Sequence, residues 1–89
     1  MNLGKSWVLL VRKDVYRKLE KFPVFDRTRL TQVVESLSTD PFAGDVEKMG
    51  GEEDTWRRRV GSYRIFLELI KKDRVVYVFD VERRKSNTY

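Results

Sequence analysis

Three arginines flank a predicted tight turn, because Arg57 and Arg59 precede Gly61-Ser62 and Arg64 follows it. A two-residue turn with glycine first joins antiparallel strands, so Arg59 is expected opposite Arg64. The same count places Arg57 opposite Phe66. Residues opposite one another share a sheet face, where like charges are destabilising. Because arginine forks match phosphate geometry and aromatic rings stack on bases, this face predicts binding of RNA or another phosphate ligand.

A second turn at Lys72-Asp73 extends the same face to the next strand. Its register places Phe79 opposite Phe66 and Val81 opposite Arg64, and a longer strand would add Arg83 to the arginines. Tyr77 and Phe79 then lie beside Phe66.

Two features weigh against a site on this face. Acids such as Glu68 or the run Glu52-Glu53-Asp54 could neutralise the arginines in the fold. Arg58 falls on the opposite, apolar face, where we expect it at the sheet edge with its stem buried and its head in water.

Charge and composition exclude several classes of function. The chain has 89 residues, which predicts a single domain over residues 1–89, and its net charge is +5. Residues 1–54 carry 9 basic and 10 acidic side chains, and residues 55–89 carry 10 basic and 4 acidic ones, so the whole excess lies in the second segment. Cys and His are absent, which excludes disulfides and thiol catalysis and argues against a metal or other cofactor. We find no membrane span or signal peptide and expect a cytoplasmic protein.

The elements that must position these residues form a simple order. Residues 7–12 predict a strand, and two helices follow, the first capped by Asp14 and ended by Pro23, the second capped by Asp26. Residues 38–54 read as a loop, and residues 56–60, 63–70 and 75–81 as a three-stranded antiparallel meander. We therefore predict an α+β domain: an N-terminal strand, an antiparallel helical hairpin and the meander, with both helices packed on one sheet face.

Two segments resemble toxins of the RelE/ParE type. The first is Lys48-Met49-Gly50-Gly51 followed by the run from Trp56 to Phe66 (WRRRVGSYRIF). The second runs from Val81 to Tyr89 (VERRKSNTY) and resembles the C-terminal Arg…Tyr of that family. The order of strand, two helices and three strands matches across nearly the whole chain. The resemblance implies a microbial RNase-like fold without the usual histidine.

The resemblance also implies a function and a set of site residues. RelE-like members are toxins of toxin–antitoxin pairs that cut mRNA in the ribosomal A site, whereas ParE-like members are thought to inhibit DNA gyrase. The arginine of the family's C-terminal Arg…Tyr has two candidates in this sequence, Arg84 and Arg83. The full expected set is Arg57, Arg59, Arg64, Arg84 and Tyr89 as catalytic, with Lys48, Phe66, Arg83 and Lys85 in RNA binding.

The implied chemistry is attack of the RNA 2′-OH on the adjacent phosphate. This reaction needs a base, cations that stabilise the pentavalent phosphate, and an acid for the leaving oxygen. Arg57 stands where the family often has lysine, and an arginine is not easily deprotonated. We therefore expect mainly electrostatic catalysis, with the ribosome holding the mRNA and rRNA nearby.

Two other functions remain open, a non-enzymatic gyrase inhibitor and an RNA-binding module that cuts nothing. The resemblance further implies a cognate acidic antitoxin, whose amphipathic helix would lie across the helices or the basic face.

Overall fold

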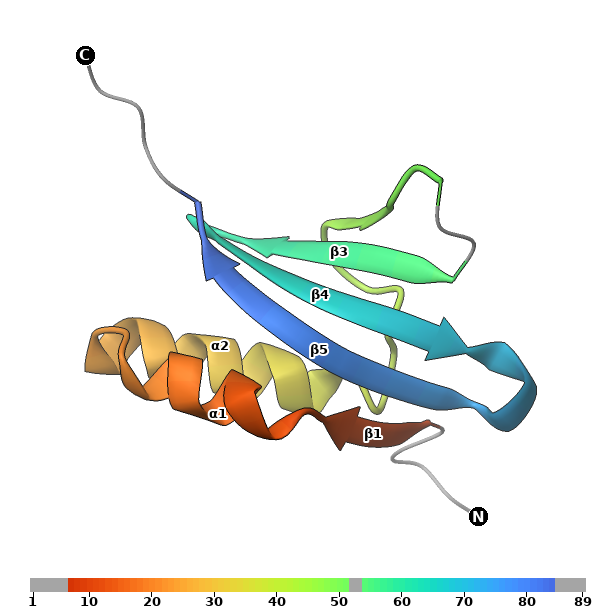
Figure 1. Cartoon of the computed structure of the whole chain (residues 1–89), viewed down its shortest axis with the longest axis horizontal. Helices are drawn as coiled ribbons and strands as arrows, with labels where there is room; N and C mark the ends of the chain where they lie inside the picture. The colour runs from red at the N-terminus through yellow and green to blue at the C-terminus, as the bar shows by residue number, and fades with distance from the viewer. Residues whose placement is uncertain (1–6, 52–53, 85–89) are drawn as a thin grey trace.

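The computed structural model describes residues 7–51 and 54–84, and within them a five-stranded sheet lies beside two helices (Figure 1). The strands are ordered β1-β5-β4-β3-β2, with β1 parallel to β5 and the other pairs antiparallel. This arrangement confirms the predicted α+β class. The elements are β1 (Val8–Val11), α1 (Lys13–Glu20), α2 (Val24–Ser36), β2 (Val46–Lys48), β3 (Thr55–Val60), β4 (Tyr63–Ile70), the short 3₁₀ turn η1 (Lys71–Asp73) and β5 (Val75–Arg83).

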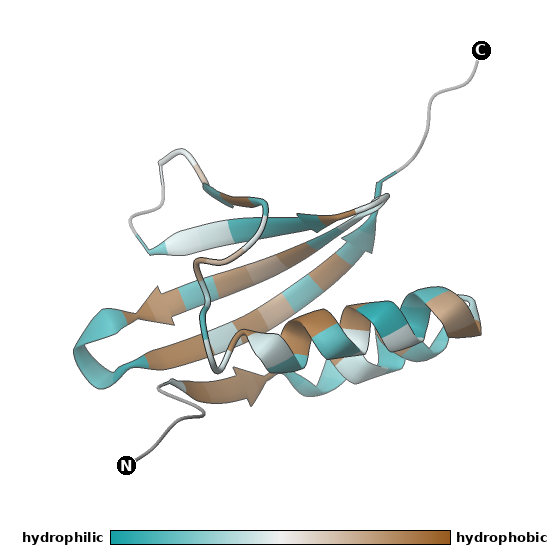
Figure 2. Ribbon diagram, turned by 180° about the vertical axis from the view of Figure 1, so that it is seen from behind, coloured by the Kyte–Doolittle hydropathy of each residue, from teal (hydrophilic) through white to brown (hydrophobic). Residues whose placement is uncertain are grey.

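Both helices cover one face of the sheet (Figure 2). Mainly aliphatic side chains are buried between the helices and the sheet. From the helices, Val15, Leu19 and Leu30 are buried. From the sheet, every second residue of β4 is buried, beginning with Tyr63. This alternation is why β4 separates an apolar face from an open one. The buried set is Val15, Leu19, Leu30, Val34, Leu37, Val60, Tyr63, Ile65, Leu67, Leu69, Val76, Val78 and Val81.

The hairpin of β3 and β4 has the predicted register. Arg59 pairs with Arg64, and Arg57 pairs with Phe66. Gly61 has a φ of +58°, a conformation that L side chains rarely adopt, so glycine suits this turn. The predicted core face, which includes Val60 and Ile65, is the buried one.

The predicted register between β4 and β5 is wrong beyond residue 78, because a β-bulge interrupts the pairing of the two strands. Phe66 pairs with Asp80 instead of Phe79, and Arg64 pairs with Glu82 instead of Val81. Strict alternation would have placed Val81 on the open face. The bulge instead places Val81 in the core, where it is 1% exposed, and the apolar burial gained there favours the extra residue.

Three local predictions also need correction. The predicted loop contains β2, a three-residue strand on β3 that is too short to show a periodicity. Arg12 and Pro23 are the helix N-caps, and Asp14 and Asp26 lie inside the first turns, where their charge still favours the helix N-terminus. Pro23 follows the end of the first helix, as predicted, and is also the N-cap of the second, since its fixed φ suits a helix start. Neither described helix is long and apolar enough to span a membrane.

Candidate functional site

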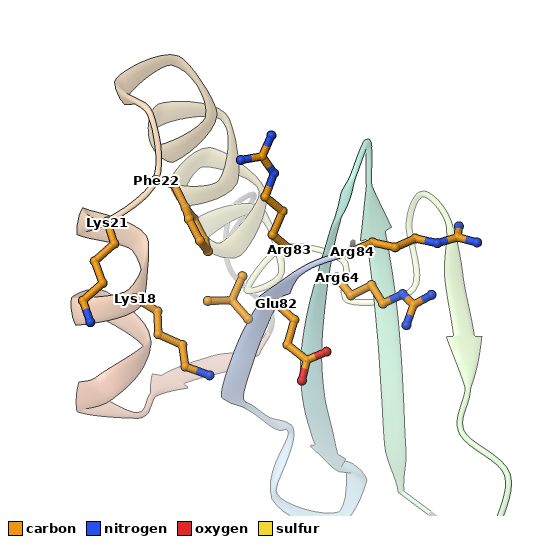
Figure 3. Close-up of a pocket in the computed structure, with 8 residues that line it drawn as sticks. Lys18, Lys21, Phe22, Arg64, Glu82, Arg83 and Arg84 are labelled. Carbon is orange, nitrogen blue, oxygen red and sulfur yellow. The ribbon is translucent and has the colours of Figure 1, made fainter. Parts of the chain in front are cut away.

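The open face of the sheet carries a group of basic side chains that we call the arginine cluster, defined as Arg57, Arg59, Arg64 and Arg84. Arg59 and Arg64 lie on directly paired positions of β3 and β4, so their side chains share a face. Arg84 follows the end of β5, and its backbone N–H donates to the Ser62 carbonyl oxygen at 2.5 Å. Figure 3 shows Arg64 and Arg84 projecting to the same side, away from Arg83.

Two members of the cluster are held by acids from the β2 region. Arg57 donates to Glu47, its register partner on β2, and this hydrogen bond lowers the pKa of the Glu47 carboxyl. Arg59 donates to Asp45 through Nε at 3.1 Å. Acids therefore partly neutralise the arginine cluster, as the sequence analysis allowed. The acids are Asp45 and Glu47, which that analysis did not name. Asp45 and Glu47 are two residues apart in the sequence, a spacing that places both carboxylates on one face of a strand and could have identified them.

Among the described residues, the other two members of the cluster, Arg64 and Arg84, have no such partner. Within residues 7–51 and 54–84, neither Arg64 nor Arg84 has a carboxylate within 4 Å. The Nε of Arg64 is shielded from solvent and has no hydrogen-bond acceptor in that part of the chain. Glu68 lies on the same face without pairing to any described arginine, and Glu52 and Glu53 lie outside the described residues. Arg64 thus has donors available for a ligand.

Arg83 lies on the other side of the sheet, so the expectation that it joins the arginines is wrong. The bulge pairs Arg83 with Tyr63, and its guanidinium carbon lies 5.7 Å from the Tyr63 ring centroid. The Tyr63 hydroxyl donates to Asp26 at 2.8 Å. Burial, together with this hydrogen bond, raises the pKa of Tyr63. Arg83 therefore packs on the helix side, and of the two candidates for the last arginine the geometry favours Arg84.

The remaining predicted site residues do not all lie on the open face. Lys48 pairs with Trp56, which places it on the helix-covered side of the sheet edge. Phe66 lies on the open face beside Arg57. Lys85 and Tyr89 lie outside the described residues, so their roles stay predictions.

Arg58 anchors the segment that carries the two acids. Its guanidinium donates to the Ala43 carbonyl oxygen at 3.0 Å at the exposed end of the side chain. Gly44 has a φ of +83°, and a Cβ there would lie 2.4 Å from the Arg58 guanidinium carbon. The positive φ favours glycine here, and the missing side chain leaves room for the Arg58 guanidinium beside the segment that carries Asp45.

A pocket of about 590 Å³ lies at the end of β5, between the cluster and α1 (Figure 3). Phe22 and Val81 form its apolar part, and Glu82 is its one acid. Lys18, at its edge, pairs with Asp80 at 2.5 Å, and this hydrogen bond raises the pKa of Lys18. The basic residues that line it are Lys18, Lys21, Arg64, Arg83 and Arg84. Across the described part of the chain, no three acidic side chains group closely enough to hold a metal ion.

Comparison with known proteins places this geometry in a family. Residues 10–88 match the family described as the ParE toxin of the type II toxin–antitoxin system parDE. A Methanocaldococcus jannaschii protein that carries the name toxin RelE1 is 23% identical over 79 residues, covering 85% of this chain and 88% of the relative.

Solved structures show the same fold. The archaeal RelE–RelB complex from Pyrococcus horikoshii has a TM-score of 0.79 at 24% identity, covering 92% of this chain and 99% of that one. The isolated Escherichia coli RelE toxin has a TM-score of 0.71 at 20% identity, covering 92% and 88%. The chain, with its RelE fold, therefore belongs to the ParE toxin family and is a toxin of the RelE/ParE type.

Proposed function

We propose that this toxin is an endoribonuclease that acts on the ribosome and cuts mRNA in the A site by attack of the 2′-OH. The observation that carries the proposal is the pairing of Arg59 with Arg64 on an open sheet face, where Arg64 forms no ion pair within the described residues although Glu82 is its register partner on β5. Folding does not require this repulsive pair, whereas a phosphate between two guanidinium groups would resolve it.

Substrate phosphate would replace the acids on Arg57 and Arg59. Both carboxylates are about half exposed, with side-chain exposures of 47% for Glu47 and 56% for Asp45. Ion pairs this exposed contribute little to stability, so a phosphate can replace the carboxylate with little loss of free energy. The cluster can therefore be partly neutral in the free toxin and still bind RNA.

Catalysis on this face would be electrostatic and positional. The arginines would stabilise charge on the pentavalent phosphate, and a well-placed donor of this kind is worth about 3–4 kcal/mol. Arginine is a poor general base because its pKa exceeds about 12. Tyr89 is our candidate for proton transfer or for orienting a base, since neighbouring positive charge favours phenolate. The ribosome would hold the mRNA in line, so we expect the free toxin to cut naked RNA poorly.

Mapping mRNA 5′ ends after induction in cells tests this function. We expect breaks within translated codons, and about 100-fold fewer with Arg64→Gln. Arg17→Gln is the matched control, because Arg17 loses the same charge on the exposed side of α1. Unchanged cutting by Arg64→Gln would remove Arg64 from the site. Supercoiling defects with intact mRNA would favour gyrase inhibition, and RNA binding without breaks would favour a non-catalytic module.

We also propose that an acidic antitoxin covers the pocket at the end of β5. Several structural neighbours are toxin–antitoxin complexes, among them the intact Escherichia coli RelBE complex. An amphipathic segment could place an apolar residue on Phe22 and acids near Lys18 and Lys21. The toxin released from its antitoxin would act on the ribosome in the cytoplasm.

Coexpression with a neighbouring short acidic reading frame tests the antitoxin proposal. We expect growth to be rescued, and Lys21→Glu to weaken the rescue without lowering mRNA cutting. Lys13→Glu, at the exposed start of α1 and outside the pocket, is the matched charge reversal and should be rescued normally. Equal rescue of both variants would place the antitoxin elsewhere.

A further inference from the structure

Three aromatic side chains form a line across the open face, and we call them the aromatic row: Phe66 on β4, with Phe79 and Tyr77 on β5. The Phe66 and Phe79 ring centroids lie 6.3 Å apart, with planes inclined by 37°. The Phe79 and Tyr77 centroids lie 6.4 Å apart, with planes inclined by 32°. All three residues are partly exposed, since no helix covers this face. The row is therefore open to a ligand that stacks on rings.

One end of the row touches the arginine cluster, because Phe66 pairs directly with Arg57. The other end reaches β1, where Leu10 pairs with Tyr77 and is 49% exposed. The open face is thus divided into a cationic half toward β3 and an aromatic half toward β1. Such a division matches a nucleotide strand, whose phosphates are anionic and whose bases are flat and apolar on their faces.

We propose that the aromatic row is a stacking track for two or three bases of single-stranded RNA that adjoin the phosphate held by the arginine cluster. This inference rests on the proposed function, since it assigns the neighbouring nucleotides of the same substrate. The ring spacing is nearly twice the rise of about 3.4 Å between stacked bases. Each ring therefore takes its own base, and the strand lies splayed across the sheet instead of stacking on itself.

Glu68 fixes which part of the nucleotide faces the row. It pairs with Tyr77 on β5 and shares the open face, where it has no ion-pair partner among the described residues. A carboxylate there repels phosphates but tolerates bases, which can donate hydrogen bonds to it. The backbone of the RNA consequently runs over the arginines, and the bases extend toward β1. The row contributes to substrate binding and orientation.

Binding of an uncleavable 2′-O-methyl hexanucleotide, followed by fluorescence anisotropy at low salt, tests the row without requiring any cutting. We expect Phe79→Leu to weaken binding about tenfold, a change typical of losing one stacked base. Phe25→Leu is the matched control, because Phe25 is 78% exposed on α2, away from the open face. Its binding should equal that of the wild type.

An abasic form of the same oligonucleotide tests stacking without altering the protein. The wild type should bind the abasic strand at least about 100-fold more weakly, because two or three stacked bases are lost at about tenfold each, and Phe79→Leu should bind that strand as well as the wild type does. Equal binding of intact and abasic strands by the wild type would overturn the proposal, even if mRNA cutting is observed in cells. A second outcome would also overturn it: Phe79→Leu binds the strand normally but loses antitoxin binding or self-association. The row would then be covered by a protein. Base-dependent binding without any mRNA cutting would instead overturn only the proposed catalysis.

Discussion

The two faces of the sheet are built from alternate residues of the same strands, yet they have opposite properties. On β4, Ile65 and Leu67 are completely buried against the helices, whereas Arg64 and Phe66 remain partly exposed on the other side. The covered face is mainly aliphatic, and the open face carries most of the charges and rings. With the proposed function, stability and RNA binding are separated by one residue of alternation, so substitutions on the two faces should affect different measurements.

The largest effect on stability should come from the covered face. Leu67→Ala removes a fully buried side chain, so the free energy of unfolding should fall by about 2–5 kcal/mol in urea denaturation. Phe66→Ala, the adjacent residue on the open face, should cost clearly less. Equal losses for the two variants would contradict the separation.

Tyr63→Phe tests the end of the covered face, where a polar group joins the core. Losing the hydrogen bond to Asp26 should lower the free energy of unfolding by about 1–2 kcal/mol. Because folding raises the pKa of Tyr63 above its usual value of 10.0, this residue stabilises the fold fully below pH 10 and less as the pH rises further.

Urea unfolding between pH 8 and pH 11 would therefore sharpen the comparison. The stability of the wild type should fall at the alkaline end, and that of Tyr63→Phe should fall less. Phe22→Leu, which alters the ring packed on Tyr63 but leaves the hydroxyl, is the control and should keep the alkaline loss. Parallel pH curves for all three proteins would show that Tyr63 is not responsible.

Arg59→Gln should change RNA binding and leave stability almost unaltered. The variant loses an exposed pair with Asp45 but also relieves the repulsion from Arg64, so we expect a net change within about 0.5 kcal/mol. Losing one phosphate contact should lower the slope of log affinity against log salt by about 0.7 for a single strand. An unchanged slope would show that Arg59 does not contact phosphate.

Glu47→Gln should have the smallest effect. It frees Arg57 from its carboxylate partner, so the same hexanucleotide should bind about two- to fivefold more tightly. Glu35→Gln, an exposed acid on α2, removes equal charge on the covered side and should leave binding unchanged. Weaker binding by Glu47→Gln would mean that Glu47 positions Arg57 instead of competing for it.

Much of the fold followed from the sequence where local signals were strong. The Gly61-Ser62 turn determined the register of β3 and β4, because a two-residue turn leaves no other pairing. The core face followed from alternation along the same hairpin. The arginine pair at the centre of the site was predicted for the same reason.

The parts that were missed depend on contacts between distant segments. The bulge in β5 arises because Val81 packs in the core, which no count from the Lys72-Asp73 turn could show. The acids Asp45 and Glu47 reach the arginines only because β2 pairs with β3. The Arg58 contact with Ala43 depends on a loop conformation that composition does not specify.

The bulge also makes the position of a length change in β5 decisive. The bulge is one extra residue, so deleting Phe79 or Asp80 would restore uniform alternation and leave Val81 opposite Ile65 in the core. Deleting Glu82, after the bulge, would instead move Arg83 to the open face and Arg84 to the helix side. A length change of one residue therefore keeps the facing of these side chains at one point of the strand and reverses it at another, whereas substitutions alter positions one at a time.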